Sequence, residues 1–329
     1  MDLVCEQLNN MNGLEVKLLN LGAAITSVSV PDPNGGRVNL VLGYGNTEDY
    51  TNDQLYFGST PGRYANRIGR GRFGLNGREY TLTLNEGRNH LHGGVTGFAK
   101  QYWQADRNKN TVVFSYVSED GENGYPGTLN VTIAYSLNDD NELAIKYSAM
   151  SDADTVINLT NHAYFNLCGV GQIMDHYLCL NADSFVVLDP ELIPTGEIYK
   201  AAGGVMDFSS PRRIGDAVLS DDEAIKNAGG IDACYVIRGE GLRCAAVLSE
   251  PVSGRMLEVY TDLPGLQVYT GQWIPAGTRG RDGLVYGPLC GVCLEAQNFP
   301  DAPNRPEFPP AVLKAGEAFS AAIIYRFIF

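Results

Sequence analysis

Alternation of apolar and polar residues is the feature of this chain that most limits its fold. Between residues 129 and 137 the side chains Leu129, Val131, Ile133, Tyr135 and Leu137 occupy every second position, with small or polar residues between them. This period of two is typical of a strand with one buried face and one wet face, as in antiparallel sheets. Similar apolar runs predict further strands within residues 14–30, 38–42, 111–117, 143–149 and 178–188.

Turn-forming clusters separate these runs. Proline, asparagine and glycine gather at residues 31–36 and 120–127, where fixed or positive φ angles turn the chain. The 38 glycines and 18 tyrosines suit many strands joined by loops, and residues 221–227 are one of the few plausible helical segments. A chain of 329 residues ordinarily suggests two domains, but no linker or repeat divides this one. We therefore predict an all-β fold, largely antiparallel with few short helices, in a single domain spanning residues 1–329.

The charge balance restricts the partners. A net charge of −14 repels polyanions and anionic bilayers, so nucleic acid and membrane surfaces are disfavoured, whereas a neutral small molecule is indifferent to that field. The first residues lack the basic and apolar regions of a signal peptide, and no apolar run approaches membrane-spanning length. Seven cysteines, an odd number, agree with a reducing compartment. These features predict a cytoplasmic protein.

The stretch around His162 does not resemble ordinary core. His162 is one of four histidines, and it is flanked by the polar Asn161 and Asn166 and followed by Tyr164. An imidazole exchanges a proton near neutral pH, so His162 is a candidate general acid or base. A buried, hydrogen-bonded structural histidine is the alternative, and this stretch alone leaves both open.

Arginines are concentrated at residues 62–72. Arg63, Arg67, Arg70 and Arg72 fall within ten residues of an otherwise acidic protein. They fit a phosphate or nucleic-acid patch, a solvated face paired with carboxylates, or a single arginine that enters a pocket. In a pocket, the planar guanidinium suits sugar hydroxyls or holds a carboxylate in place.

Two short patterns have the spacing of metal ligands. His90 and His92 would share one face of a strand, but no third ligand follows at a recognisable spacing. The glycines after His92 favour a loop whose backbone closely approaches a ligand. Cys290 and Cys293 have redox or zinc spacing, yet only one such pair exists, so buried thiols are the favoured interpretation.

Two carboxylates stand out. Glu295 lies in an apolar strand pattern, where it would share a face with Cys293 and Gln297. A buried carboxylate is costly unless it has a partner, so Glu295 is a candidate functional group. Asp232 follows two glycines and precedes an apolar run; it is either a turn residue, which the sequence slightly favours, or a carboxylate that binds hydroxyls.

Several motifs occur together in one order. They are Asn-Arg at 66–67, Leu-His-Gly-Gly at 91–94, Asn-His-Ala-Tyr-Phe-Asn at 161–166, Val-Tyr-Thr-Gly at 268–271 and Leu-Glu-Ala-Gln-Asn-Phe-Pro-Asp at 294–301. With these motifs the chain resembles the aldose 1-epimerase (galactose mutarotase) family nearly from end to end. Separate motifs in a fixed order make this resemblance specific.

The resemblance implies a large β-supersandwich of the galactose mutarotase type with an open cleft, no cofactor and no metal. It implies interconversion of the α- and β-anomers of hexoses, with a small aldose as the partner. His162 aligns with the general acid and Glu295 with the general base. The positions that align with sugar-binding residues are Asn66, Arg67, His92, Tyr164, Asp232 and Gln267.

The expected chemistry places one proton donor and one acceptor on a single sugar. An ordinary glutamate, with a pKa of about 4.3, is ready as a base at neutral pH. An ordinary imidazole, with a pKa of about 6.5, needs support to stay protonated, and a nearby Glu295 is expected to supply it.

One departure from the family pattern concerns Asp232. Ala233 and Cys234 follow it where the family commonly has His-Asn, so its hydrogen bonding is less secure. Three rival functions stay open: a sugar-binding module without catalysis, a hexose-phosphate epimerase that uses the arginines, and a glycoside hydrolase that uses Asp232 and Glu295. The sequence also leaves open the preferred hexose and whether the chain is a monomer or a homodimer.

Overall fold

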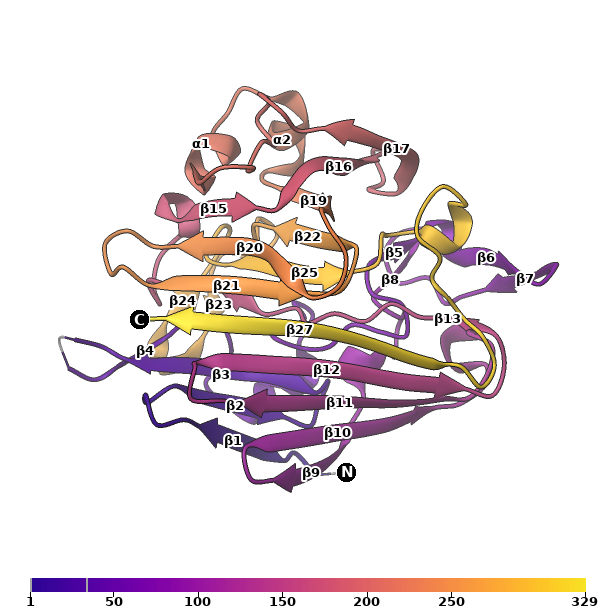
Figure 1. Ribbon diagram of the computed structural model, residues 1–329, viewed down its shortest axis with the longest axis horizontal. Coiled ribbons are helices and arrows are strands. Elements are labelled where there is room, and N and C mark those ends of the chain that lie inside the picture. Colours follow the sequence, from indigo (N-terminus) through magenta and orange to yellow (C-terminus); the bar gives the residue numbers. More distant parts are fainter. Residues whose placement is uncertain (1, 34) are drawn as a thin grey trace.

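A nine-stranded antiparallel sheet forms one layer of the molecule. The computed structural model describes residues 2–33 and 35–329. Neighbouring strands of this sheet pair antiparallel throughout (Figure 1). In spatial order they are β18 (Arg212–Arg213), β15 (Tyr177–Leu180), β20 (Arg243–Ser249), β21 (Met256–Thr261), β27 (Ala318–Ile328), β12 (Glu142–Ser151), β11 (Leu129–Leu137), β10 (Thr111–Ser118) and β9 (Gln104–Asn108).

Two further sheets complete the sandwich. The six-stranded sheet runs β14 (Tyr164–Phe165), β25 (Val292–Gln297), β22 (Gly265–Tyr269), β19 (Asp232–Ile237), β16 (Ala182–Leu188) and β17 (Pro194–Lys200). The four-stranded sheet runs β1 (Cys5–Asn9), β2 (Glu15–Leu19), β3 (Ala24–Pro31) and β4 (Arg37–Asn39).

Short strand pairs and helices fill the loops. The pairs are β5 (Arg67–Ile68) with β8 (His90–Leu91), β6 (Arg72–Leu75) with β7 (Arg78–Thr81), β13 (Thr155–Val156) with β26 (Val312–Leu313), and β23 (Thr278–Arg279) with β24 (Val285–Tyr286). The α-helices are α1 (Ile214–Val218) and α2 (Glu223–Ala228), and the other helical turns are short 3₁₀ segments. The prediction of an all-β fold with few short helices is confirmed. No helix in the described part of the chain is long and apolar enough to span a membrane.

The alternating pattern produces the core. The odd-numbered side chains of β11 are buried, and Ile133 lies opposite Tyr147 of β12. Phe165 of the six-stranded sheet packs against Tyr325 of β27, with ring centroids 5.0 Å apart. The nine-stranded and six-stranded sheets therefore share one apolar layer.

The strand predicted within residues 178–188 is confirmed, and it is divided between two sheets. The chain leaves the nine-stranded sheet after β15 and enters the six-stranded sheet as β16. Asn181 occupies the crossing point, and its amide group donates hydrogen bonds to the carbonyls of Arg238 and Cys244. The periodicity continues through this crossing because both sheets face the same core, so the pattern alone conceals the break.

The predicted helix at 221–227 is present as α2, shifted by a residue or two. Such a shift is within the usual uncertainty of helix ends.

Ile133→Ala should lower the free energy of unfolding by about 2–5 kcal/mol, because the side chain is fully buried and its removal leaves a cavity. Urea denaturation followed by fluorescence measures the loss. Thr132→Ala, on the exposed face of the same strand, is the matched control and should change stability by less than about 0.5 kcal/mol. Equal losses in the two variants would contradict this assignment of faces.

Candidate active site

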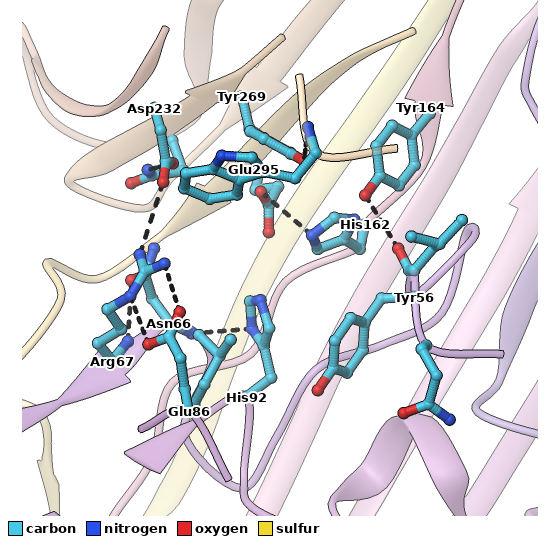
Figure 2. Close-up of a pocket in the computed structure, with 15 residues that line it drawn as sticks. Tyr56, Asn66, Arg67, Glu86, His92, His162, Tyr164, Asp232, Tyr269 and Glu295 are labelled. Atoms are coloured by element: carbon cyan, nitrogen blue, oxygen red, sulfur yellow. Dashed lines mark hydrogen bonds and ion pairs between the residues drawn. The ribbon is translucent and has the colours of Figure 1, made fainter. Parts of the chain in front are cut away.

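A cleft of about 210 Å³ opens over the six-stranded sheet. Strands β14, β25, β22 and β19 supply one side of it; the β5–β8 pair and the loop at residues 54–56 supply the other (Figure 2). It is lined by Gln54, Leu55, Tyr56, Asn66, Arg67, Glu86, Leu91, His92, His162, Tyr164, Asp232, Gln267, Tyr269, Trp273 and Glu295. All eight residues predicted for the site lie in this set, and their chemical roles remain predictions.

Strand register gathers three of these residues. Glu295 of β25 lies opposite Gln267 of β22, and Asp232 begins the neighbouring strand β19. The Gln267 amide donates to an Asp232 carboxylate oxygen at 2.5 Å. Asp232 is therefore a cleft carboxylate and not the turn residue that the sequence slightly favoured. The departure at Ala233 and Cys234 leaves it with Gln267 and Arg67 as partners.

His162 reaches the cleft from a segment outside regular strands. Its backbone N–H donates to the Ser59 carbonyl, and its own carbonyl accepts from the Gly58 N–H. The Asn161 amide donates to the Gly58 carbonyl at 2.8 Å, which ties the same two segments together. The polar residues around His162 thus hold the backbone, which explains why this stretch did not read as ordinary core.

His162 and Glu295 face one another across the cleft. The distance from His162 Nε2 to Glu295 Oε1 is 3.7 Å, and both side chains are almost completely buried (Figure 2). The second oxygen of Glu295, Oε2, has no hydrogen-bond partner among the described residues. Two groups capable of proton transfer, distant in the sequence, are therefore within reach of one small ligand.

Burial drives both groups towards their neutral forms. It lowers the pKa of His162 to about 4. Burial, reinforced by the negative charge of Asp232 and opposed by Arg67, raises the pKa of Glu295 well above its usual range. Burial outweighs the support that Glu295 was expected to give to an imidazolium. When the pair holds one proton, both pKa shifts favour its place on the carboxyl group over its place on the imidazole.

Arg67 is the cleft arginine among the four in its cluster. Its Nε and Nη2 atoms each donate to Glu86 at 2.7 Å, and its Nη1 lies 3.6 Å from Asp232 Oδ2. Arg63 is buried elsewhere and donates to the carbonyls of Pro126 and Gly127. The pocket interpretation of the arginine cluster thus applies to Arg67.

His92 is held in one tautomer by Asn66. The Asn66 backbone N–H donates to His92 Nδ1 at 3.1 Å, and both residues have a positive φ. A ring nitrogen that accepts a hydrogen bond carries no hydrogen, so the proton of the neutral ring lies on Nε2. Burial holds the pKa of His92 well below its usual range, and repulsion from the positive charge of Arg67 and from any proton on His162 lowers this pKa further. His92 is therefore a neutral hydrogen-bond donor.

Metal ligation was tested on two sets of residues. The first set is His90 and His92, which have the spacing of metal ligands. Both ring nitrogens of His90 already have partners, because Nδ1 lies 2.6 Å from the Thr83 carbonyl and Nε2 lies 2.6 Å from the Tyr125 hydroxyl. A second set, His92, His162 and Glu295, brings its possible ligand atoms within 4.8 Å of one another. Neither nitrogen of His92 offers a free lone pair in the observed hydrogen bonding, so this set does not suit a metal ion.

The cysteine pair consists of free thiols. Cys290 and Cys293 are both buried and unpaired with each other, as predicted. Cys293 Sγ lies 3.5 Å from His162 Nδ1, and burial raises the pKa of this thiol well above its usual range. The thiol therefore keeps its hydrogen and orients the imidazole from the side opposite Glu295.

Tyr164 shapes the wall next to His162. Its hydroxyl donates to the Leu55 carbonyl at 2.9 Å, and its ring centroid lies 5.0 Å from that of His162. The hydrogen bond ties β14 to the loop at residues 54–56. Tyr164 is thus placed as a wall residue that fixes this loop.

Seven lining residues were not predicted from the sequence: Gln54, Leu55, Tyr56, Glu86, Leu91, Tyr269 and Trp273. Glu86 and Tyr56 stand in loops without periodicity, whereas Tyr269 is part of the Val-Tyr-Thr-Gly motif and Trp273 lies two residues after it. The Tyr56 ring packs against His92 with centroids 4.7 Å apart, and its φ of 59° is unusual for a bulky residue. Such strain is visible only in coordinates. The one signal in the sequence was the rarity of tryptophan, because Trp273 is one of two in the chain and lies close after a family motif.

The comparisons with known proteins define the class. The sequence profile described as aldose 1-epimerase matches residues 5–326. Galactose mutarotase from Bos taurus is 42% identical over 317 residues, covering 95% of this chain and 91% of that protein. Aldose 1-epimerase from Escherichia coli K12 is 36% identical over 327 residues, covering 98% and 94%. The crystal structure of an aldose epimerase homologue from C. elegans superposes with a TM-score of 0.92 at 30% identity, covering 99% of each chain.

The fold is therefore that of the galactose mutarotases, and the buried His162 and Glu295 side chains face one another in its cleft. The chain belongs to the aldose 1-epimerase family.

The neutrality of the two cleft histidines can be measured directly. ¹⁵N NMR at about pH 5.5, where an ordinary imidazole is mostly protonated, should show His92 as the neutral Nε2–H tautomer and His162 still mostly neutral. His92→Gln and His162→Gln assign the signals, and the urea-unfolded chain, titrating near the ordinary value, is the reference. An Nδ1–H tautomer or an imidazolium at His92 would contradict the assigned hydrogen bond.

Proposed function

We propose that this protein interconverts the α- and β-anomers of free hexoses such as galactose and glucose. The observation that carries the proposal is the 3.7 Å contact between His162 Nε2 and Glu295 Oε1 in an open cleft. A pure binding site has no use for two facing proton-transfer groups whose pKa values are displaced in opposite directions.

The reaction needs one proton taken and one given. The Glu295 carboxylate removes the proton from the C1 hydroxyl, and the His162 imidazolium delivers a proton to the ring oxygen as the C1–O5 bond breaks. Rotation about C1–C2 and reversal of both transfers close the ring on the other face of the aldehyde. The protons balance, and each positioned group typically contributes roughly 10²- to 10⁴-fold.

The active proton distribution contains the same single proton as the resting one. It places that proton on His162 and leaves Glu295 ionised, an arrangement that burial disfavours. A bound sugar stabilises it by donating the C1 hydroxyl to Glu295 and accepting at the ring oxygen. Cys293 suits both states of His162 when Nδ1 keeps its hydrogen and donates it to the Cys293 sulfur, because Nε2 is then free to take and give the proton.

The remaining cleft residues are proposed to hold the sugar. His92 and Arg67 present donors to oxygens on which negative charge develops. Asp232 and Gln267 offer acceptors to hydroxyl groups, and Gln267 Oε1 has no partner among the described residues. Asn66 fixes His92 through its backbone, and Tyr164 packs beside His162.

The charge of the cleft argues against a phosphorylated substrate. Arg67 is the one arginine or lysine in the described lining, and Glu86 and Asp232 already pair with it. A hexose phosphate would meet an excess of carboxylates. The glycoside hydrolase alternative lacks support because Asp232 is bound to Arg67 and Gln267.

We further propose a single domain over residues 1–329 and a cytoplasmic location, as a monomer or homodimer without nucleic-acid or membrane partners. One apolar cluster that extends from Leu8 to Phe327 supports the single domain. The net charge of −14 supports the absence of anionic partners.

Glu295→Gln should abolish acceleration of mutarotation, because the amide keeps the size of the side chain and cannot accept the C1 proton. Polarimetry of freshly dissolved α-D-galactose and α-D-glucose measures the approach to equilibrium, with and without EDTA, which should have no effect. Unchanged protein fluorescence and Tm are the control for folding. Wild-type protein that binds sugar yet leaves equilibration at the buffer rate would instead favour a binding module.

The pH dependence of kcat/KM should be bell-shaped, because the active pair carries one proton. Activity should fall at acid pH as His162 and Glu295 both become protonated, near the His162 pKa of about 4, and at alkaline pH as both lose their protons. Asp232→Asn should move the alkaline limb to lower pH, because it removes a charge that raises the Glu295 pKa. Asp183→Asn, at an exposed site, should leave both limbs in place. If the alkaline limb of Asp232→Asn stays in place or moves to higher pH, the Asp232 charge does not raise the Glu295 pKa as proposed.

A further inference from the structure

The Arg67 guanidinium is clamped by a carboxylate that is not among the sugar-binding positions implied by the family resemblance. Glu86 accepts from both Nε and Nη2 of Arg67 at 2.7 Å, which is the bidentate geometry that fixes a guanidinium most firmly. Arg67 Nη1 is left to face Asp232 at 3.6 Å. The Arg67 side chain is 6% exposed, so its orientation depends on these partners.

Glu86 is held for this contact by its own loop. Its backbone N–H donates to the Asn89 carbonyl, and its carbonyl accepts from the Asn89 N–H, which closes a tight turn at residues 86–89. The side chain is 33% exposed at the edge of the cleft (Figure 2). A carboxylate in that position faces any ligand that enters the cleft.

The two carboxylates determine what charge a ligand meets. Glu86 and Asp232 together outweigh the single positive charge of Arg67, and Glu295 adds a further acidic group. Without Glu86, the Arg67 guanidinium would present two free N–H edges and a positive charge to the cleft, which is the recognition geometry for a carboxylate or phosphate.

We propose that Glu86 is a positioning and specificity-determining residue. It orients Arg67 towards the Asp232 side of the cleft and cancels the charge that would otherwise recruit acidic sugars. This inference rests on the proposed epimerase function and assigns to Glu86 the discrimination between a hexose and the corresponding hexuronate, which differ only in a CH₂OH or COO⁻ group at C6.

The test compares α-D-galactose with α-D-galacturonate at neutral pH, each followed by ¹H NMR of its anomeric signals above the buffer rate. Wild-type protein should act mainly on galactose. Glu86→Gln keeps the shape of the side chain and removes its charge, so kcat/KM for galacturonate should rise roughly tenfold at low ionic strength and less in salt. For galactose, KM should rise a few-fold with kcat nearly retained, because Arg67 is less firmly oriented.

Two further variants separate charge from other effects. Asp183→Asn removes an exposed carboxylate that pairs with Lys200 outside the cleft, changes the net charge by the same amount and should leave both sugars unaffected. Glu86→Asp keeps the charge and should keep the preference for galactose, even if the shorter side chain weakens the clamp. An unchanged ratio of the two sugars in Glu86→Gln, or an equal shift in Asp183→Asn, would overturn the assignment. A wild-type protein inactive on galactose would defeat the proposed function itself.

Discussion

The burial of Glu295 against His162 is the interaction on which the site depends. A carboxyl group 2% exposed, with one oxygen unpartnered, is expensive to keep in a strand of an otherwise apolar sheet. Burial raises the pKa of this group, so the neutral carboxyl form is favoured and limits the cost. Partners in the cleft that stabilise the carboxylate are therefore needed before Glu295 ionises readily.

The sandwich makes this burial possible by fixing geometry before any ligand arrives. Glu295, Gln267 and Cys234 lie at paired positions of three adjacent strands, each held by hydrogen bonds along its length. His162 comes from a segment tied at Ser59 and Gly58, so its ring is held by backbone contacts independent of the sheet. Glu295 is thus held by the six-stranded sheet, and His162 is held by a segment with its own backbone hydrogen bonds. Supports of this kind keep functional side chains in a fixed geometry.

The sequence carried most of the fold and the core of the site, for identifiable reasons. The strand at residues 129–137 was predictable because its buried side chains occupy every second position, which is the period of a strand. Strand within residues 178–188 was predicted as well, but not the change of sheet at Asn181, because both sheets share one core and the apolar pattern continues through that residue. His162 and Glu295 were noticeable as polar groups in apolar or aromatic surroundings, but their assignment to one site came from the family resemblance. Spacing along the chain says nothing about a contact over 133 residues.

What the sequence could not supply was the state of each group. The local sequence slightly favoured a turn at Asp232 because glycines precede it, and only the family resemblance placed it in the site; its partner Arg67 is distant in the chain. Glu86 was not predicted because a carboxylate in a loop usually points into water. The turn at residues 86–89 places its side chain against the Arg67 guanidinium, and the sequence does not show this contact.

The support that Glu295 was expected to give to a protonated His162 was overestimated for a similar reason. Reference pKa values describe groups in water, and both members of the pair are almost without it. Desolvation penalises each charge separately. Two groups that would form an ion pair in solution therefore favour their uncharged forms when buried, as a neutral imidazole and a protonated carboxyl group. A substrate that hydrogen-bonds to both can reverse that order, since it offers each charged form the partners that water would have given. In the proposed reaction, the uncharged pair and the imidazolium–carboxylate pair differ only in which residue holds one proton. The site would therefore need no proton from outside during a turnover.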